Sequence, residues 1–571
     1  MKHASLRSAL TIIVAALVAG AAIVGLLPPY WIFLATAVLI TAVALLSLGL
    51  VTGRTGMIAL CQMSFAGVGA WTVGYLNIWN APGGLPLWIL LGGVAAVPLG
   101  IAIGLPALRL RGINLAIVTL SFAAAFDTIL ATITYPGQTS FISVPRPELV
   151  DSDEGYFVFV LAIYALVAVG LAFVTRTRLG ASWLAVRHSE RAAAAHGVSV
   201  PMAKLSAFAI SAFIAGISGG MLAGYLGTLV SENFSMMQSL TLFAVATMAG
   251  AHLAEGAIIG GILITLFPEL LRRLGLPQDI GNVIFALGAT QALSTGEAIA
   301  ETFRRLGRKL RRRPPVVAAS SPQEHLPTRI EHPAGTALKI EDLTVRYGSV
   351  VALDEVSFLV PSGTVVGLIG PNGAGKSTFI DAVAGFLDGY EGQVSLNGRP
   401  LEGASANKRA RLGVRRSWQT TRIAPELTVG EYLNLAAGGL SERERVAVLA
   451  WLGCPSPETP VAQVDAGTRR LLDVAGVAAA RPAVVLLDEP GAGQSYDQAL
   501  KLGARIAEIP ELFGSAVLLV EHDMDLVRAA CSQIRVLDFG RIIASGPPAA
   551  VLDNPAVKKA YLGVTEESDA A

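Results

Sequence analysis

The chain has 571 residues, enough for several domains, and 53 % of them are hydrophobic while only 15 % are charged. Soluble domains usually carry about 25 % charged residues, so a wholly soluble protein is excluded. The formal net charge of +1 gives no support to nucleic-acid binding, and the three cysteines form no CxxC or Cys/His cluster that would indicate a disulfide framework or a metal site.

Residues 1–300 are dominated by Ala, Leu, Ile, Val and Gly. A helix needs about 20 largely apolar residues to cross a bilayer. Windows that meet this demand predict about ten membrane helices, near 8–27, 31–51, 58–79, 86–105, 112–133, 156–174, 204–229, 236–251, 256–271 and 280–298. We keep the first window as a helix rather than a signal peptide, because a second span follows at once without a convincing cleavage site. The sequence therefore predicts an all-α polytopic domain over residues 1–303.

Two polar features interrupt this apolar half. His252 and Glu255 fall between the windows 236–251 and 256–271, so this stretch is either two full spans or a re-entrant pair. Asp127 lies in an apolar span, where a carboxylate is costly and indicates a functional site. Its place near the outer end of the span is equally compatible with an interfacial or helix-packing role.

The distribution of basic residues predicts the orientation. On an alternating topology one side collects Lys2, Arg7, Arg54, Arg109, Arg111, Arg176, Arg178, Arg187 and Arg191. The positive-inside rule makes that side cytoplasmic and the acidic loop near 134–155 external. Arg272 and Arg273 oppose this pattern, since they would be external.

Residues 304–337 are predicted to link the two halves. A basic run of seven Arg and Lys residues spans 304–313, and a Pro-rich tether follows it. A nucleic-acid site is one interpretation of the run. Its position directly after a membrane span favours anionic lipid headgroups instead.

The soluble half, residues 338–571, contains VVGLIGPNGAGKSTFID at 365–381. An apolar strand leads into a Gly-rich turn, and a helix opens with Lys and Ser, which is the context that makes a P-loop credible. The backbone N–H groups of such a loop bind phosphate, the Lys adds a charge and the Ser hydroxyl binds Mg²⁺. The predicted nucleotide-binding residues are Gly370, Pro371, Asn372, Gly373, Ala374, Gly375, Lys376, Ser377 and Thr378.

Further ATPase elements follow in order. VVLLDEP at 484–490 is an apolar strand that ends in Asp488, a candidate ligand of Mg²⁺ through water, and Glu489, a candidate to polarise the attacking water. The strand LLVEHD at 518–523 leads to His522, which is placed to contact the γ-phosphate. Tyr347 could stack on adenine or belong to the core.

These motifs resemble the nucleotide-binding domain of ABC transporters over about 338–565. The end of the chain, from LLVEHDMDLVRAA to AVKKAYLG, resembles the ATPase subunits of branched-chain amino-acid uptake systems. LRLRGINLAIVTLSFA at 108–123, VRHSERAAAAHGV at 186–198 and the region 229–273 are similar to the permease subunit of the same systems. The chain thus resembles a natural fusion of one permease subunit with one ATPase subunit.

The resemblance implies an α/β P-loop ATPase domain with ATP and Mg²⁺ as cofactors. It implies that Glu489 is the general base, that His522 is the switch residue, and that Gln419 senses the γ-phosphate and joins Ser377 and Asp488 around Mg²⁺. VRHSERAAAAHGV would be the coupling helix that docks in an ATPase domain, with Arg187, Glu190, Ala193 and Gly197 among its contact residues; an ordinary amphipathic surface helix is the alternative. The implied partners are a second permease, a second ATPase, an extracellular solute-binding protein and the lipid bilayer.

One departure from the family pattern affects the second nucleotide site. Where the signature LSGGQ is expected, the chain reads VDAGT at 464–468, which retains Gly467 but places Asp465 at the usual Ser. An ionised carboxylate cannot donate a hydrogen bond to the γ-phosphate held by the opposing subunit, and it would repel that phosphate. Asp465 could equally be a helix N-cap. We expect the site that faces VDAGT to be weak or silent, while the chain's own P-loop hydrolyses ATP.

The expected function is that of a permease–ATPase subunit of an importer for branched-chain or related apolar amino acids in the bacterial plasma membrane. Urea and short amides are alternative substrates. An ABC exporter half or a regulatory membrane ATPase is the alternative class, although many short, Gly-interrupted spans favour an importer.

Overall fold

The computed structural model describes residues 2–133, 135–137, 142–277, 279–310, 317–320 and 325–562. The chain forms two compact units. The helical unit consists of Met1–Trp183 and Pro201–Pro314, and the α/β unit consists of Leu184–Val200 and Pro315–Ala571. A short segment of the N-terminal half therefore belongs to the α/β unit. Arg311, Arg312 and Arg313 of the predicted basic run lie outside the described residues.

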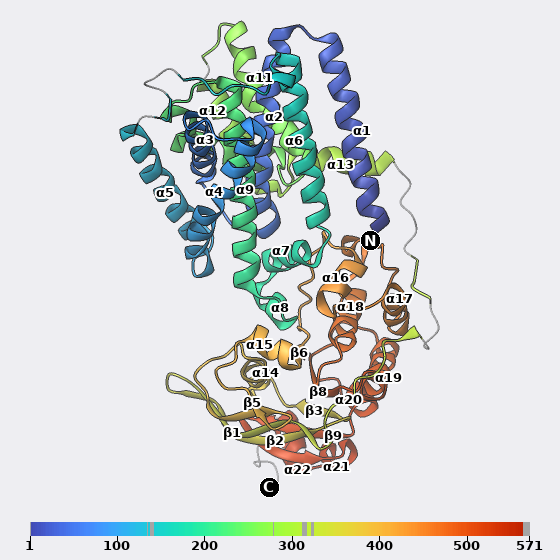
Figure 1. The fold of residues 1–571 in the computed structure, drawn as a ribbon. Coiled ribbons are helices and arrows are strands. Elements are labelled where there is room, and N and C mark those ends of the chain that lie inside the picture. The colour runs from blue at the N-terminus through green and yellow to red at the C-terminus, as the bar shows by residue number, and fades with distance from the viewer. Residues whose placement is uncertain are drawn as a thin grey trace. The chain divides into compact units, whose positions relative to one another are not determined.

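Each of the ten predicted windows coincides with one helix of the helical unit (Figure 1). The helices of this half are α1 (Lys2–Leu26), α2 (Pro29–Gly49), α3 (Gln62–Ile78), α4 (Gly84–Gly104), α5 (Ile113–Thr132), α6 (Asp153–Val174), α7 (Arg178–His188), α9 (Val200–Leu226), α10 (Met236–Ala249), α11 (Ala254–Arg273), α12 (Asp279–Thr295) and α13 (Ile299–Leu310). Among the described residues, α1, α2, α4, α5, α6, α9 and α11 are long and apolar enough to cross a membrane alone. The pair α12 and α13 is bent by 54° and meets the same test only jointly.

Helices α3 and α10 are too short to span alone, with 17 and 14 residues. Side chains of other helices complete their N-terminal ends. The N–H of Leu60, before α3, donates to Thr119 Oγ1 at 3.0 Å, and the N–H of Met63 donates to Ser239 Oγ at 3.1 Å. Non-helical backbone at membrane depth requires such partners, because lipid offers none.

Asp127 serves the same purpose at α10. Its Oδ2 accepts the N–H of Met236, the first residue of that helix, at 3.1 Å. A carboxylate at a helix N-terminus accepts a hydrogen bond from a backbone N–H that has no partner within the helix. Its negative charge is also attracted to the positive end of the helix dipole. Of the roles that the sequence left open for Asp127, helix packing is the one seen. The stretch 236–271 consists of this short helix and the full-length α11.

Glycines allow α3, α4 and α9 to touch backbone to backbone. A Cβ built on Gly69 would lie 2.1 Å from the carbonyl oxygen of Gly216, and one on Gly92 would lie 2.7 Å from the oxygen of Gly69. Membrane helices use small residues in this way because close approach maximises dispersion contact where no hydrophobic effect operates. The three helices are therefore fixed by positions that exclude any side chain.

We expect Gly69→Ala to destabilise the helical unit, because the added methyl group overlaps a backbone oxygen that cannot move aside. Overpacking of this kind costs about 1–3 kcal/mol. The measurement is the thermal midpoint of the detergent-solubilised protein. The matched control is Gly170→Ala in α6, where a Cβ would meet nothing within 4 Å. Equal midpoints for the two variants would contradict the packing argument.

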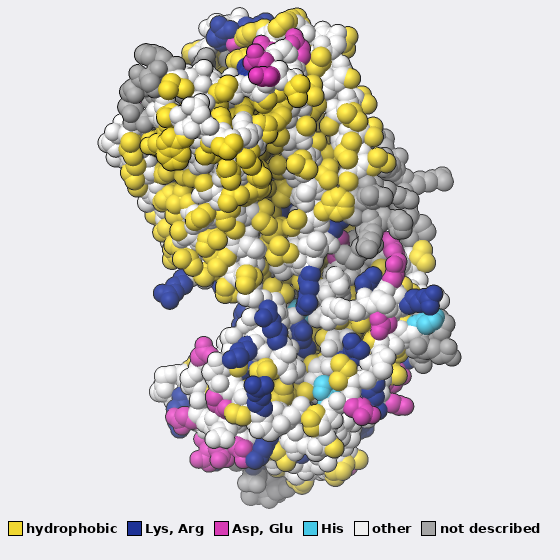
Figure 2. All heavy atoms as spheres, viewed as in Figure 1, with side chains coloured by type: hydrophobic (Ala, Val, Ile, Leu, Met, Phe, Trp, Pro, Cys, Tyr) yellow, Lys and Arg dark blue, Asp and Glu magenta, His cyan; other side chains and the backbone are white. Residues whose placement is uncertain are grey.

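The outer surface of the helical unit is apolar. Figure 2 shows hydrophobic side chains over most of its visible face, and exposed aliphatic residues include Leu17, Leu90, Ile117, Leu166 and Leu287. Patches of this extent on a folded unit mark contact with lipid or protein.

Arg272 and Arg273, which oppose the predicted orientation, share the carboxylate of Glu269. Both donate to the carboxylate of Glu269 at 2.8 Å, and Tyr30 Oη donates to it as well. Because the positive-inside rule counts Arg and Lys rather than net charge, these two arginines remain an exception to the predicted pattern.

The α/β unit is built on two sheets. An antiparallel sheet has the order β2-β1-β4-β5, and a mostly parallel sheet has the order β10-β9-β3-β8-β7-β6. The strands are β1 (Thr336–Tyr347), β2 (Val350–Pro361), β3 (Val365–Ile369), β4 (Glu391–Leu396), β5 (Arg399–Pro400), β6 (Val414–Arg416), β7 (Val484–Asp488), β8 (Ala516–Val520), β9 (Gln533–Asp538) and β10 (Arg541–Gly546). The helices are α8 (Glu190–Ala195), α14 (Lys376–Ala384), α15 (Ala406–Leu412), α16 (Val429–Ala436), α17 (Glu442–Trp451), α18 (Ala466–Ala479), α19 (Tyr496–Phe513), α20 (Met524–Ala530), α21 (Pro548–Leu552) and α22 (Pro555–Leu562).

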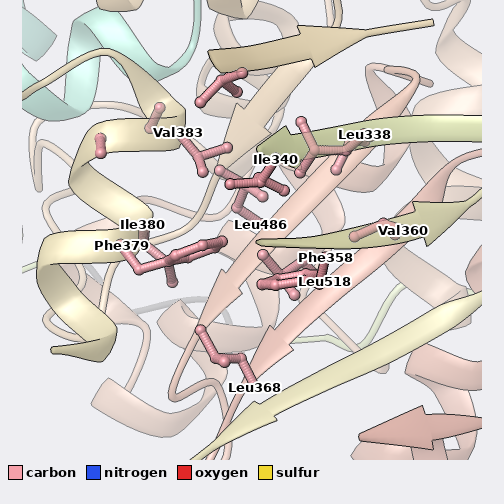
Figure 3. Packing of buried hydrophobic residues seen from close by; sticks show 14 of the residues in the cluster. Leu338, Ile340, Phe358, Val360, Leu368, Phe379, Ile380, Val383, Leu486 and Leu518 are labelled. Carbon is pink, nitrogen blue, oxygen red and sulfur yellow. The ribbon is translucent and has the colours of Figure 1, made fainter. Parts of the chain in front are cut away.

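The core of this unit gathers residues of both sheets and of α14 (Figure 3). Ile340 and Phe358 come from the antiparallel sheet, and Leu486 from the parallel one. Phe358 stacks on Phe379 of α14 with ring centroids 5.0 Å apart. Because α14 begins at the end of the predicted P-loop, this packing holds the loop on a rigid base.

Candidate nucleotide-binding site

The parallel sheet brings the predicted ATPase motifs to one edge. Strands β3, β8 and β7 are parallel neighbours, with Leu368 opposite Val520 and Asp488 opposite the same residue. The carboxyl ends of parallel strands meet at one edge, which is where ligands bind in such sheets. The P-loop follows β3, Glu489 follows β7 and His522 lies two residues beyond β8.

The P-loop has the geometry that its glycines predict. Gly375 has φ +107°, and a Cβ there would lie 2.6 Å from the carbonyl oxygen of Ala352, so glycine is required. Lys376 Nζ lies inside the loop and donates to the carbonyl oxygens of Gly370 at 2.7 Å and Pro371 at 2.9 Å. Burial lowers the pKa of Lys376, and the nearby carboxylates of Glu489 and Asp488 oppose this shift. The ammonium is thus held where a helix N-terminus and loop amides can bind phosphate.

Asp488 lies against an arginine that the sequence motifs do not reveal. Arg416 of β6 donates from Nη2 to Asp488 Oδ2 at 2.9 Å and also pairs with Asp381 of α14. Burial raises the pKa of Asp488, and Arg416 opposes the shift. Arg416 is buried and belongs to none of the sequence motifs. Its position beside Asp488 follows only from the pairing of β6 with β7.

Glu489 occupies a strained turn directly after β7. Its φ is +47°, a left-handed conformation that non-glycine residues rarely adopt and that clusters at functional sites. Its Oε2 accepts from Gln419 Nε2 at 2.7 Å, and His522 Nδ1 lies 3.8 Å from the same oxygen. The structure therefore brings together all three predicted catalytic residues.

The loop that carries His522 depends on Glu521, which the sequence analysis did not single out. This buried carboxylate accepts the backbone N–H groups of Gly491 at 2.6 Å and His522 at 3.1 Å. It thereby ties the segment after Glu489 to the segment after β8. The sequence signal for Glu521 was its place directly before His522 at the end of the strand motif. A carboxylate that is buried there requires hydrogen-bond donors.

We expect Glu521→Gln to destabilise the α/β unit by about 1–3 kcal/mol. An amide has one acceptor oxygen instead of two, so a buried N–H loses its partner. The change would appear as a lower thermal midpoint of the full-length protein. Glu511→Gln at an exposed position of α19 is the matched control, and a midpoint lowered equally by both changes would contradict this role for Glu521.

The oxygen ligands near the loop fit Mg²⁺. Ser377 is exposed on the first turn of α14, and the Asp488 carboxylate and the Gln419 side chain belong to the same edge. Among the described residues no group of three His, Cys, Asp or Glu side chains could hold a metal. One carboxylate with hydroxyl and amide oxygens suits an ion that keeps water and phosphate ligands, as Mg²⁺ does.

Tyr347 lies at the exposed end of a strand, and Asp465 caps a helix. Tyr347 ends β1 and is 53 % exposed, so it is not a core residue. Asp465 is the N-cap of α18, where its Oδ1 accepts the N–H of Thr468 at 2.9 Å. The hydrogen bonds from Thr468 hold the pKa of Asp465 below its usual range, which keeps the carboxylate ionised. Gly467 follows in the first turn of the same helix.

The segment 184–200 packs beside this site, within the α/β unit. It is not one helix: α7 ends at His188, and Ser189 caps the short helix α8 through the N–H of Ala192. Arg191 Nη2 pairs with Asp381 Oδ2 at 2.7 Å, and its guanidinium lies 5.0 Å from the ring centre of Phe386. Asp381 thus forms ion pairs with both Arg191 and Arg416, and Arg416 also pairs with Asp488.

The end of the segment enters a buried polar network. His196 Nε2 lies 3.3 Å from Tyr432 Oη and 3.6 Å from Asp473 Oδ1. Tyr432 donates to Asp473 at 2.6 Å, and Asp473 Oδ2 accepts the N–H of Trp418, which precedes Gln419. Burial lowers the pKa of His196 to about 3, so the imidazole is neutral and the contact with Asp473 is not an ion pair. Sequence analysis missed His196, because its partners come from distant helices.

The four contact residues predicted in this segment have different surroundings. Arg187 Nη1 lies 3.8 Å from Glu426 Oε1, and Ala193 is fully buried. The carbonyl oxygen of Gly197 accepts from Arg411 Nε at 2.9 Å. Glu190 opens α8 as its first residue. Ala192, Ala193 and Ala195 of the segment are buried, and Arg191 is exposed.

Comparison with known families gives three matches along the chain. Residues 30–287 match the family described as the permease component of the branched-chain amino acid transport system. Residues 353–492 match the ABC transporter family, and residues 541–567 match the branched-chain amino acid ATP-binding cassette transporter family.

Individual relatives resemble the ATPase half. The high-affinity branched-chain amino acid transport ATP-binding protein BraF of Pseudomonas aeruginosa is 36 % identical over 249 residues, which are 40 % of this chain and 97 % of the relative. LivG of Escherichia coli, named likewise, is 31 % identical over 252 residues, again 40 % of this chain and 97 % of the relative. The crystal structure of a nucleotide-free ATP-binding cassette from an ABC transporter is 26 % identical, covers 40 % of this chain and 100 % of its own, and has a TM-score of 0.35.

The chain is therefore an ABC transporter protein that carries a permease and an ATP-hydrolysing domain in one polypeptide. Within that class it belongs to the branched-chain amino acid transporter family, as a permease–ATPase fusion.

Proposed function

We propose that this fusion is a subunit of an importer that moves branched-chain or related apolar amino acids inward across the plasma membrane. The observation that carries the proposal is the segment 184–200. It lies in the permease half of the sequence, yet its Arg191 pairs with Asp381, which pairs with Arg416, the residue that holds Asp488. Its His196 contacts Asp473, which accepts the N–H of Trp418, the neighbour of Gln419. A segment of the permease sequence that packs inside the ATPase unit supports the coupling of ATP hydrolysis to transport.

The chain's own residues supply the elements of ATP hydrolysis. Lys376 and the loop amides bind and orient phosphate, and Glu489 accepts a proton from the attacking water. Gln419 donates a hydrogen bond to the Glu489 carboxylate and orients it, and His522 Nδ1 lies 3.8 Å from the same oxygen. Bound Mg²⁺ would supply charge neutralisation, held by Ser377, Asp488 and Gln419. Exposed Tyr347 would stack on the base.

The assembly we propose has a second permease, a second ATPase and an extracellular solute-binding protein, with the ATPase domain in the cytoplasm. ABC ATPases act as head-to-tail pairs, so Asp465 and Gly467 would face the nucleotide of the partner. The ionised Asp465, already engaged as an N-cap, supports a weak site there and an active site at this chain's P-loop.

The test is uptake by the complete complex in proteoliposomes, with binding protein on the outside and ATP on the inside. We expect ATP-dependent accumulation of leucine, isoleucine or valine, and no accumulation with Lys376→Ala. Accumulation of urea or short amides alone would reassign the substrate, and outward movement of solute would refute the importer.

A further inference from the structure

A small cavity lies within the α/β unit, next to α8. The space in it that the centre of a water molecule can occupy is about 10 Å³, which is enough for one such molecule. Buried apolar side chains form much of its wall, Ala193 among them. His196, Trp418, Tyr432 and Asp473 bring polar groups to the same wall. The cavity thus combines the size of a single water molecule with polar partners.

Two polar atoms of this wall stand out. Among the described residues, no hydrogen-bond partner meets the buried atoms His196 Nδ1 and Trp418 Nε1. The two residues are only 4 % and 7 % exposed. A buried polar atom without a partner costs free energy, so proteins pair nearly all of them, with ordered water where no protein group is within reach. The two atoms therefore indicate a ligand in the cavity.

The surrounding hydrogen bonds show which role each atom plays. Tyr432 Oη donates its single hydrogen to Asp473 Oδ1 at 2.6 Å, so toward His196 it can only accept. The neutral imidazole therefore carries its hydrogen on Nε2, which lies 3.3 Å from Tyr432 Oη, and its Nδ1 is an acceptor. The indole Nε1–H of Trp418 can only donate. Arg422, which lies 5.3 Å from the centre of that ring, has no acceptor to offer it.

These roles define the chemistry of the ligand. It must accept a hydrogen bond from Trp418 and donate one to His196. A metal cation cannot accept from an N–H. An anion without a hydrogen cannot donate to Nδ1, and it would be repelled by the carboxylate of Asp473, which lines the same cavity. A water molecule does both with one oxygen and has the right size.

We infer that the cavity binds one water molecule, which accepts from Trp418 Nε1 and donates to His196 Nδ1. This water closes a ring of hydrogen bonds. His196 donates to Tyr432, Tyr432 donates to Asp473, and the backbone N–H of Trp418 donates to the other oxygen of Asp473. Each donor in such a ring strengthens the next bond. The ring ties the end of α8 to α16, to α18 and to the residue that precedes Gln419.

The first test is an experimental structure of the full-length fusion at a resolution that shows ordered water elsewhere in the α/β unit. We expect one density peak at about 2.7–3.2 Å from both His196 Nδ1 and Trp418 Nε1. The absence of a peak there would overturn the inference, and so would a direct hydrogen bond between the two side chains.

The second test compares two variants in the wall of the cavity. Serine and cysteine are similar in size, so A193S and A193C fill the cavity to a similar extent. Only the hydroxyl of serine donates and accepts hydrogen bonds as the displaced water did. We expect the thermal midpoint of A193S to exceed that of A193C by roughly 2–4 °C, about the effect of one hydrogen bond in a unit of this size.

The matched pair is A382S and A382C in the apolar core of the α/β unit. There the order should be reversed, because cysteine behaves as a small hydrophobic residue. A higher midpoint for A193C than for A193S would show that the cavity is dry and that the inference is wrong. If the variants at Ala193 do not fold, the density in the unmodified protein decides.

Discussion

Replacing Glu489 with Gln is expected to lower ATP hydrolysis by the assembled transporter by roughly 10²–10⁴-fold, the usual contribution of a general base. The amide keeps the size of the side chain and can still accept the hydrogen bond from Gln419, but it cannot accept a proton from water. ATP binding should persist, because Lys376 and the loop amides are unchanged. Phosphate release and binding of labelled ATP measure the two effects separately.

The matched control is Glu391→Gln on the exposed end of β4, which should leave hydrolysis intact. The same experiment tests the asymmetry between the two sites. Because Asp465 is ionised and occupied as a helix cap, the site that faces it should not replace the lost activity. Substantial hydrolysis by an assembly that carries Glu489→Gln would show that the second site is active.

The fold and the central site could be predicted because their signals are local. The apolar run before Gly370, the loop glycines and Lys376 specify strand, turn and helix in one stretch, and the structure has β3 and α14 at those bounds. The ten apolar windows likewise coincide with ten helices, although among the described residues seven of them are long and apolar enough to cross a membrane alone. The lengths of α3 and α10 were not predictable in this way, since they depend on Thr119, Ser239 and Asp127 of other helices.

The residues that were missed act through distant partners. Arg416 belongs to no motif, and its role appears only when β6 pairs with β7. Glu521 precedes a recognised histidine, but its function comes from the N–H of Gly491 across the site. In the sequence, His196 is one polar residue in an alanine-rich run. Its role appears only in the folded structure, where it contacts Tyr432 and Asp473. Sequence identifies the chemistry of a motif more readily than the contacts that support it.

Two routes join segment 184–200 to the catalytic edge. In the first, Arg191 pairs with Asp381, which pairs with Arg416, which holds Asp488. In the second, His196 contacts Asp473, which accepts a hydrogen bond from the N–H of Trp418. Gln419 follows Trp418 directly and donates to Glu489. The first route is charged and partly exposed, so water and salt weaken it. The second route is buried from His196 to Trp418 and neutral at the imidazole, so we expect it to transmit more of the coupling.

His196→Ala is therefore expected to lower the amount of solute transported per ATP hydrolysed by roughly five-fold or more. Removing one partner from a buried polar network costs about 1–3 kcal/mol, which is about a five- to 150-fold loss of the docked segment. The P-loop, Glu489 and His522 are untouched, so hydrolysis should fall much less than uptake. Parallel assays of uptake and phosphate release in proteoliposomes give the ratio.

Two further variants make the result specific to the buried network. His188→Ala, an exposed histidine at the end of α7, should leave the ratio unchanged. His196→Gln should retain part of the coupling, because burial holds the pKa of His196 at about 3 and a neutral side chain is what the site accommodates. An unchanged ratio in His196→Ala would show that the segment is coupled to the ATPase by the arginine route instead. An equal loss in His188→Ala would show that the effect is not specific to the buried network.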